Sequence, residues 1–397
     1  MVVASALLAG CSGGGNEVTI DIRRPDAAGS TTPGATPSTP APSSGAAAPS
    51  ASVPFTADGE PNAIGTVATG LTSPWGIAFL PDGRALVTER DTARVLLLSP
   101  RDGGYVRSGA SGRTQAVKAR VSEVGQLRIA RPRGEGGLLG VAVSPTYEQD
   151  RLVYFYVSTE RDNRVVRARL SGGRLSPTTP VLTGIPVNST HNGGRLLFGP
   201  GGYLFVSTGD AQRREEAQQR DSLAGKILRI TPDGAPAPGN PFGSPVWSLG
   251  HRNVQGLALD ADDSLWASEF GDQTSDELNR ILPGNDYGWP RAEGREGSTD
   301  PSLTAPQLTW PTEDASPSGL AATDGYLWMA ALRGERLWRI PTRSGQVEQP
   351  TAHLTGRYGR LRSVVRAPDG RLWLATSNTD GRGEPRRGDD RIVVLEP

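Results

Sequence analysis

The chain has 397 residues, of which 51 are Gly and 33 are Pro. So large a share of residues that interrupt helices disfavours a helical bundle. The 42 Lys and Arg residues balance 42 Asp and Glu residues, so the sequence lacks the positive excess of a nucleic-acid-binding protein. A single Cys excludes a disulfide framework or a metal cluster held by several cysteines.

A short apolar segment, residues 1–11, opens the chain and ends in Leu8-Ala9-Gly10-Cys11. This ending resembles the cleavage box of bacterial lipoproteins, whose Cys becomes the lipidated first residue. An ordinary secretory signal is the alternative, but Cys11 is the only Cys and stands at the required position. We therefore expect an exported protein, held by a lipid at the outer face of the cytoplasmic membrane or lying in the periplasm.

Residues 12–60 are rich in Pro, Ser and Ala. Such a segment buries too little apolar surface to offset its chain entropy, so we expect a disordered tether. The folded part is then predicted to be residues 61–397.

Six copies of one pattern make up that folded part: a short apolar run, an Asp- or Gly-containing turn, and two further apolar runs. The turns are Pro81-Asp82-Gly83, Glu148-Gln149-Asp150, Pro200-Gly201-Gly202, Ala261-Asp262-Asp263, Thr323-Asp324-Gly325 and Pro368-Asp369-Gly370. Branched and aromatic residues beside such turns indicate β-hairpins. Six similar units favour an all-β, six-bladed β-propeller with four-stranded antiparallel blades over a pair of β-sandwiches. The run Ile64-Gly65-Thr66-Val67 is predicted to close the ring as the outer strand of the last blade.

Unusual residues recur where the first strand of each predicted blade begins. In a propeller these strands line the central channel, so the residues can converge on one site. They are Trp75, Glu135, His191, Arg252 with Asn253, and Arg360 with Arg362. A His can act as a general base near neutral pH, and clustered Arg side chains predict an anionic ligand. Taken singly, each Arg can instead form a salt bridge between blades, and His191 can be a buried structural His. We interpret His251 and His353 as structural.

Several ordered motifs make the chain similar to the soluble quinoprotein glucose/sorbosone dehydrogenase family, especially its aldose sugar dehydrogenase branch. The resemblance covers residues 65–397. Its most specific stretches are SLGHRNVQGLALD (248–260) and SEFGDQTSDELNRILPGNDYGWP (268–290), supported by GEGGLLGVAVSP (134–145), HNGGRLLFGPGGYLFVSTGD (191–210), DSLAGKILRITPDG (221–234) and GRLRSVVRAPDGRLWLATSNTDGRG (359–383).

This resemblance implies a six-bladed propeller that binds pyrroloquinoline quinone (PQQ) and Ca²⁺ near the mouth of the channel. It assigns His191 as the base that removes the proton of the sugar's anomeric hydroxyl, with Asp210 supporting it. Hydride then passes from C1 of the sugar to the quinone. Arg252 is expected to stabilise charge on the quinone oxygens, with Asn253 beside it.

The resemblance also implies the cofactor ligands. Those expected to bind PQQ are Glu135, Arg252, Asn253, Arg333, Arg360, Arg362 and Asn378. The carbonyls of Gly271 and Asp272 are expected to bind the cofactor's Ca²⁺, and Glu277 and Tyr287 further calcium ions.

Departures from the family pattern bear on substrate choice. The best-known glucose dehydrogenases carry Lys at the place of Arg333, Gln at Glu135, Pro at Asp272 and an acidic residue near Asn378. With compact loops over the channel as well, a shallower mouth is expected to admit varied sugars, including oligosaccharides.

Three functions fit these features. The first is PQQ-dependent oxidation of an aldose to its lactone, with electrons passed to an external acceptor. The second is a calcium-dependent lactonase-type hydrolase, and the third a propeller that binds a sugar or partner without catalysis. For the first, the expected partners are an aldose and an electron acceptor and include no nucleic acid. Membrane contact is expected only through lipid on Cys11, and the protein is expected to be a monomer or dimer.

Overall fold

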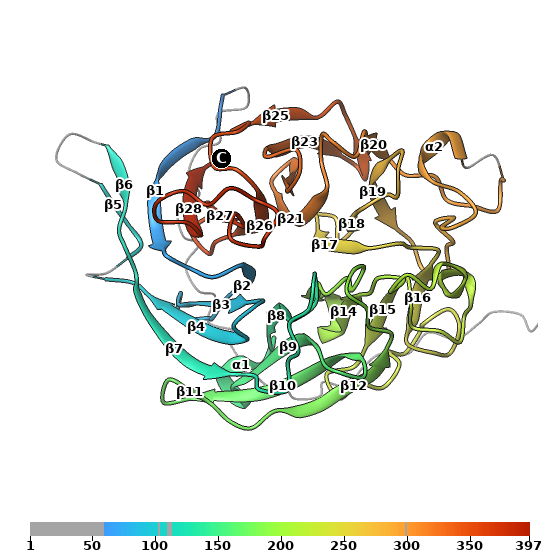
Figure 1. The fold of residues 1–397 in the computed structure, drawn as a ribbon, viewed down its shortest axis with the longest axis horizontal. Coiled ribbons are helices and arrows are strands. Elements are labelled where there is room, and N and C mark those ends of the chain that lie inside the picture. The colour runs from blue at the N-terminus through green and yellow to red at the C-terminus, as the bar shows by residue number, and fades with distance from the viewer. Residues whose placement is uncertain (1–58, 102–103, 109–112, 298–299) are drawn as a thin grey trace, which may run out of the picture. The chain divides into compact units, whose positions relative to one another are not determined.

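Six four-stranded antiparallel sheets are arranged radially around a common centre (Figure 1). The computed structural model describes residues 59–101, 104–108, 113–297 and 300–397. The predicted signal segment, Cys11 and nearly all of the predicted tether lie outside these ranges. Within them, no helix is long and apolar enough to cross a bilayer.

The first three blades follow one another along the chain, each written here from its inner to its outer strand. They are β2 (Pro74–Phe79), β3 (Ala85–Glu89), β4 (Arg94–Ser99) and β7 (Arg120–Gln126); β8 (Leu138–Val143), β9 (Leu152–Ser158), β10 (Asn163–Ser171) and β12 (Thr179–Ile185); and β13 (Leu196–Phe198), β14 (Leu204–Ser207), β15 (Lys226–Ile230) and β16 (Val246–Leu249).

The last three blades repeat this order. They are β17 (Val254–Leu259), β18 (Leu265–Glu269), β19 (Asp276–Ile281) and β20 (Leu308–Trp310); β21 (Pro317–Thr323), β22 (Tyr326–Ala331), β23 (Leu337–Arg343) and β25 (Thr351–His353); and β26 (Leu361–Arg366), β27 (Leu372–Thr376), β28 (Arg391–Glu396) and β1 (Asn62–Thr69). The pairing of β1 with β28 confirms that the N-terminal strand closes the ring.

Short elements decorate this frame. They are the hairpin β5 (Val106–Ser108) and β6 (Thr114–Ala116), β11 (Arg174–Leu175) beside β10, β24 (Gln346–Val347) beside β23, the helices α1 (Tyr147–Asp150) and α2 (Gly294–Gly297), and the 3₁₀ turns η1 (Pro200–Gly202) and η2 (Arg214–Gln218). The predicted turn at 148–150 is thus the short helix α1, and the other predicted turns join the first and second strands of their blades. Gly83 and Gly370 adopt positive φ in two of them.

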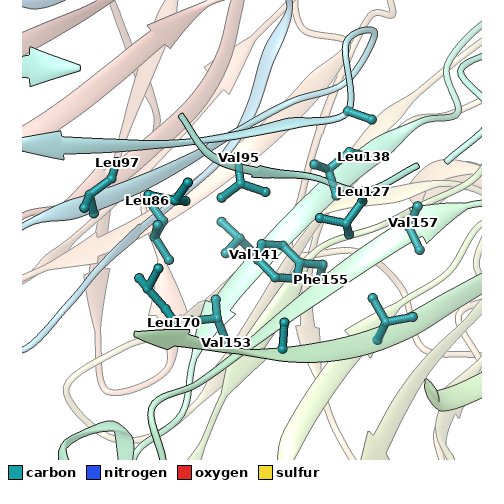
Figure 2. Packing of buried hydrophobic residues seen from close by; sticks show 14 of the residues in the cluster. Leu86, Val95, Leu97, Leu127, Leu138, Val141, Val153, Phe155, Val157 and Leu170 are labelled. Atoms are coloured by element: carbon teal, nitrogen blue, oxygen red, sulfur yellow. The ribbon is translucent and has the colours of Figure 1, made fainter. Parts of the chain in front are cut away.

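Hydrophobic side chains between neighbouring blades hold the ring together. Figure 2 shows the cluster between the first two blades, where Leu86 and Val95 face Val141, Val153 and Phe155. Fully burying one such side chain contributes about 1.5–3 kcal/mol.

The first described residues contact the fifth blade. Arg339 donates to the carbonyl of Gly59 at 3.1 Å, and Glu60 accepts from His353 Nδ1 at 2.7 Å. Gly59 and Glu60, the last two residues of the predicted tether, therefore bond to the fifth blade. His353 has the structural role expected of it.

Candidate active site

The predicted site residues lie along one edge of the blades. In each blade, the first residue of the inner strand pairs with the last or next-to-last residue of the second strand, as Val254 pairs with Glu269 and Leu361 with Thr376. Loops that precede inner strands therefore meet loops that follow second strands. The first kind carries Glu135, His191, Arg252 and Arg360, and the second carries Asp210, Asp272 and Arg333.

His191 and Asp210 form a hydrogen-bonded pair. The imidazole Nδ1 lies 2.8 Å from Asp210 Oδ1, and the His191 side chain is 17% exposed whereas that of Asp210 is fully buried. His191 has a positive φ of 57°, an uncommon conformation for a residue with a side chain. Its backbone is held there by the Glu135 carboxylate, which accepts its N–H at 3.1 Å, and by Ala211, whose N–H donates to its carbonyl. The ring is thus fixed in orientation before any ligand binds.

Asp210 accepts three hydrogen bonds. Besides His191, the donors are the Gln212 backbone N–H at 2.7 Å and the Trp289 indole Nε1 at 2.8 Å. Burial alone would raise the pKa of this carboxyl, but the bonds from His191, Gln212 and Trp289 bring the pKa below its usual value. An ionised carboxylate only accepts, so His191 Nδ1 carries the proton of the shared bond; in the neutral imidazole the lone pair then lies on Nε2. Nε2 has no partner among the described residues and is suited to act as a base.

Arg252 lies next to this pair. Its carbonyl accepts the Asp210 N–H at 2.7 Å, and its guanidinium Nη2 donates to Asp272 Oδ1 at 2.9 Å. The guanidinium lies 5.3 Å from the centre of the Trp289 ring, on which Arg214 also stacks at 4.4 Å. Arg252 Nε is buried without a hydrogen-bond partner. One indole therefore contacts both the carboxylate that orients His191 and the predicted quinone-binding cation.

Asn253 has a defined structural contact. Its Oδ1 accepts the Gly193 N–H at 3.0 Å, and the side chain is almost fully buried. This bond fixes the loop two residues beyond His191, so Asn253 supports the base as well as lying beside Arg252.

Five guanidinium groups and two carboxylates line a cavity at this edge, which we call the arginine cavity. Its charged residues are Arg90, Arg333, Arg360, Arg362, Arg382, Glu135 and Asp380, and its uncharged ones Gln255, Phe270, Ser316 and Leu332. Positive charge exceeds negative charge there, as expected for the pocket of an anion.

Arg360 and Arg362 share one counter-ion in this cavity. Asp380 Oδ2 lies 3.1 Å from Arg360 Nη2 and 3.4 Å from Arg362 Nη2. Arg362 also donates to Gln255 at 2.7 Å, its Nε is buried without a partner, and burial lowers its pKa to about 10. Burial opposes ionisation of Asp380, but the charges of Arg362 and Arg360 hold its pKa below the usual value. The Asp380 carboxylate is thus the shared counter-ion of two buried cations.

Glu135 joins the base to the arginine cavity. One carboxylate oxygen accepts the His191 N–H, and the other pairs with Arg382 Nη1 at 2.9 Å. Arg382 belongs to the loop between β27 and β28, so this ion pair reaches from the sixth blade to the second.

Two predicted cofactor ligands are placed differently from one another. Arg333 is exposed at the cavity and pairs with no other described residue. Asn378 does not line the cavity. Its Oδ1 accepts the Arg360 N–H at 2.8 Å, and its Nδ2 donates to the Tyr358 carbonyl and to Asp389. Asn378 therefore holds the backbone of Arg360.

The predicted calcium ligands lie beyond Arg252, on β19 and in the loops on either side of it. Glu277 is buried, accepts from Asn279 and Gly294, and has its pKa raised by burial and by the neighbouring Glu269. The Tyr287 hydroxyl bonds to Leu282 and Arg280, away from Glu277. Among the described residues, no three His, Cys, Asp or Glu side chains form a metal-binding group, so any calcium here needs carbonyl or amide oxygens as well.

His251 is structural, as predicted. It is fully buried, bonds Ser248 and Glu269 at 2.8 Å each, and stacks on Tyr287. Trp75 is also buried, with the Arg195 guanidinium 4.2 Å from its ring centre. It packs inside the propeller rather than at the site.

Comparison with known proteins gives a consistent result. The family model described as Glucose / Sorbosone dehydrogenase matches residues 71–385. Aldose sugar dehydrogenase YliI of Escherichia coli K12 is 30% identical over 347 residues, which cover 78% of this chain and 89% of that protein. Quinoprotein glucose dehydrogenase B of Acinetobacter calcoaceticus is 28% identical over 263 residues, covering 57% of this chain and 52% of that one. The PQQ-bound aldose sugar dehydrogenase of Streptomyces coelicolor is 50% identical with a TM-score of 0.79, covering 86% of this chain and 98% of that structure.

Proposed function

Because the chain belongs to the glucose/sorbosone dehydrogenase family, we propose that it oxidises the anomeric C1 hydroxyl of aldose sugars to lactones, using PQQ and Ca²⁺ and an external electron acceptor. The observation that carries this proposal is the connection, through Glu135, of an oriented His base to a cavity whose Arg side chains outnumber its carboxylates. Family membership favours this oxidation over the hydrolase and the non-catalytic binding protein.

The arginine cavity fits a planar tricarboxylate such as PQQ. Its guanidinium groups outnumber its carboxylates, and Arg362 keeps a buried Nε that no described residue accepts from. Arg360, Arg362 and the exposed Arg333 would hold the carboxylates, since guanidinium groups match carboxylate geometry. When bound, the quinone supplies a two-electron acceptor for the hydride that leaves C1.

The chain's own residues handle the proton. His191 Nε2 accepts the proton from the oxygen of the anomeric hydroxyl as hydride leaves C1. The sugar thereby loses two electrons and two hydrogens. The ionised Asp210 stabilises the imidazolium that forms. Arg252, next to the pair, would stabilise the negative charge that develops on the acceptor's oxygens as hydride is transferred.

Calcium fits the region around Glu277. A cavity of about 10 Å³, room for a single small ion or water, is lined by Glu269, Gly271, Glu277 and Glu293, among others. The nearby Asn279 Oδ1 is a buried acceptor without a partner. The carbonyls of Gly271 and Asp272 would hold the calcium of the cofactor, and Glu277, with the Tyr287 carbonyl rather than its engaged hydroxyl, a second ion. Calcium supplies Lewis-acid chemistry at such a site.

Reconstitution with PQQ and Ca²⁺ tests the proposal. We expect a PQQ-dependent rise in thermal stability, reduction of an electron-accepting dye with several aldoses, and the C1 lactone as product. Absence of both the thermal shift and dye reduction over a broad sugar panel would contradict it. A 1-O-methyl glycoside, which has no anomeric hydroxyl, is the matched substrate control and should be inert.

A further inference from the structure

Glu293 is enclosed by the backbone of the predicted calcium loop. It immediately precedes α2, and its Oε1 accepts four consecutive backbone N–H groups: those of Asp272 at 2.8 Å, Gln273 at 3.2 Å, Thr274 at 3.0 Å and Ser275 at 3.0 Å. Successive amides that converge on one anion form a nest. Residues 271–275 are therefore wrapped around this carboxylate.

The wrapping fixes where two carbonyls point. In a planar trans peptide the N–H and C=O groups point in opposite directions. The Asp272 N–H shares its peptide unit with the Gly271 carbonyl, and the Gln273 N–H with the Asp272 carbonyl. Because both N–H groups are directed at Glu293, both carbonyl oxygens are directed away from it. These are the two oxygens that the proposed function assigns to the cofactor's calcium.

The loop has little freedom to adopt another shape. A Cβ atom on Gly271 would lie 2.0 Å from the Ser275 carbonyl and 2.6 Å from Glu293 Oε1. The Gly271 N–H also donates to Asp276 at 2.9 Å. At the opposite side, the Asp272 carboxylate pairs with Arg252 at 2.9 Å and Arg214 at 3.3 Å. The backbone of this loop thus connects Glu293 to Arg252.

We propose that Glu293 is a positioning residue for calcium: its carboxylate holds residues 271–275 so that the Gly271 and Asp272 carbonyls face the ion. This inference rests on the proposed function. Glu293 acts through backbone amides and is not itself a ligand through Oε1, since four donors already occupy that oxygen. Residues that orient metal ligands in this way commonly change metal affinity 10–100-fold when altered.

The decisive experiment compares Glu293→Asp with Glu293→Gln. The Asp variant keeps the charge but withdraws the acceptor by one methylene, whereas the Gln variant keeps an acceptor oxygen at the original reach without the charge. At saturating PQQ, the readout is the Ca²⁺ concentration that gives half of the change in the visible spectrum of PQQ. We expect about 10–100-fold more Ca²⁺ for Asp, and a smaller increase for Gln.

The outcomes separate the possible roles. A loss for Gln as large as or larger than that for Asp would overturn the positioning role, because charge or direct ligation would then matter more than reach. Half-saturation unchanged in both variants would also overturn it. Glu215→Gln, at an exposed glutamate of η2, is the control and should behave like wild type. If wild type itself shows no spectral response to PQQ and Ca²⁺, the proposed function fails first and this inference with it. Circular dichroism verifies that each variant is folded.

Discussion

The two halves of the candidate site differ in how completely the protein satisfies their polar groups. Around His191, both Asp210 oxygens, the Glu135 carboxylate and the His191 backbone all have hydrogen-bond partners within the chain. In the arginine cavity, one carboxylate serves both Arg360 and Arg362, and the Arg362 Nε has no partner.

This difference separates residues that are preorganised from residues that await a ligand. A satisfied hydrogen-bond network is rigid and ready for proton transfer, whereas buried cations that share a single counter-ion are costly until a further anion binds. Substitutions in the first half should therefore affect turnover more than cofactor binding. Substitutions in the second half should affect cofactor binding most.

The largest expected effect is that of His191→Ala. Removing a general base lowers turnover by about 10²–10⁴-fold, while the affinity for PQQ should remain nearly unchanged because the arginine cavity is intact. Single-turnover reduction of the bound quinone and a PQQ titration measure the two quantities separately. His353→Gln, at a His remote from the site, should preserve both. Loss of PQQ binding in His191→Ala would show that the two halves are not separable.

Arg362→Met should have the opposite signature. Hydrogen bonds to charged groups contribute about 1.5–3 kcal/mol, so PQQ affinity should fall about 10–100-fold. The PQQ-free protein should lose little stability, since the substitution removes a partly unsatisfied buried charge and leaves Asp380 its bond with Arg360. Calorimetric PQQ titration and thermal unfolding measure both. Arg366→Met, an exposed position on the same strand, is the control. A large loss of stability with unchanged affinity would assign Arg362 a structural role only.

The repeats and the turn residues predicted the propeller and its closure by Ile64–Val67, because hairpin turns are local signals. The site residues in the loops before the inner strands were predicted for the same reason, since these loops lie a short distance before the recurrent turns. Arg90, Asp380 and Arg382 were missed because they follow second strands, whose ends meet the inner strands only through antiparallel pairing. Counting polar residues just after each second strand would have found them.

The roles of Trp289 and Glu293 could not be predicted from the sequence, for a different reason. Each acts through a contact with a residue distant in sequence, Asp210 for Trp289 and the 272–275 amides for Glu293. No spacing rule predicts such contacts. Likewise, Asn378 occurs in a matching motif, but only the structure reveals that its amide is engaged with the backbone of the Arg360 loop.

Trp289→Phe tests the preorganised network around His191 and Asp210 with a smaller expected effect. It removes the Nε1 donor to Asp210, so stability should fall by about 1 kcal/mol at neutral pH. That donor helps to lower the folded-state pKa of Asp210, so its contribution is present above the unfolded pKa and is lost as pH falls through the folded pKa. The stability difference from wild type should therefore shrink in acid. Chemical denaturation at several pH values measures it.

The control for this substitution is Trp247→Phe. Trp247 Nε1 is buried without a hydrogen-bond partner, so its removal should cause no pH-dependent change. A difference for Trp289→Phe that stays constant from neutral pH into acid would contradict the contribution of the indole to Asp210.

Arg333→Ala should give the smallest loss of PQQ affinity. Compared with Arg362→Met, it tests whether the exposed and the buried cations of the arginine cavity bind the anion differently. Arg333 is exposed, so its attraction for an anion is weakened by water and salt; we expect PQQ affinity to fall only by about 2–5-fold, the range of an exposed ion pair. Arg333→Lys keeps the charge and should bind like wild type.

The loss in Arg333→Ala should fade as ionic strength rises, because exposed charges are screened beyond about 10 Å at 0.1 M salt. The loss in Arg362→Met should persist in salt, because that guanidinium is buried. Equal salt dependence in the two variants would mean that the cavity binds anions as one diffuse positive field, with no division between an inner ligand and an outer one.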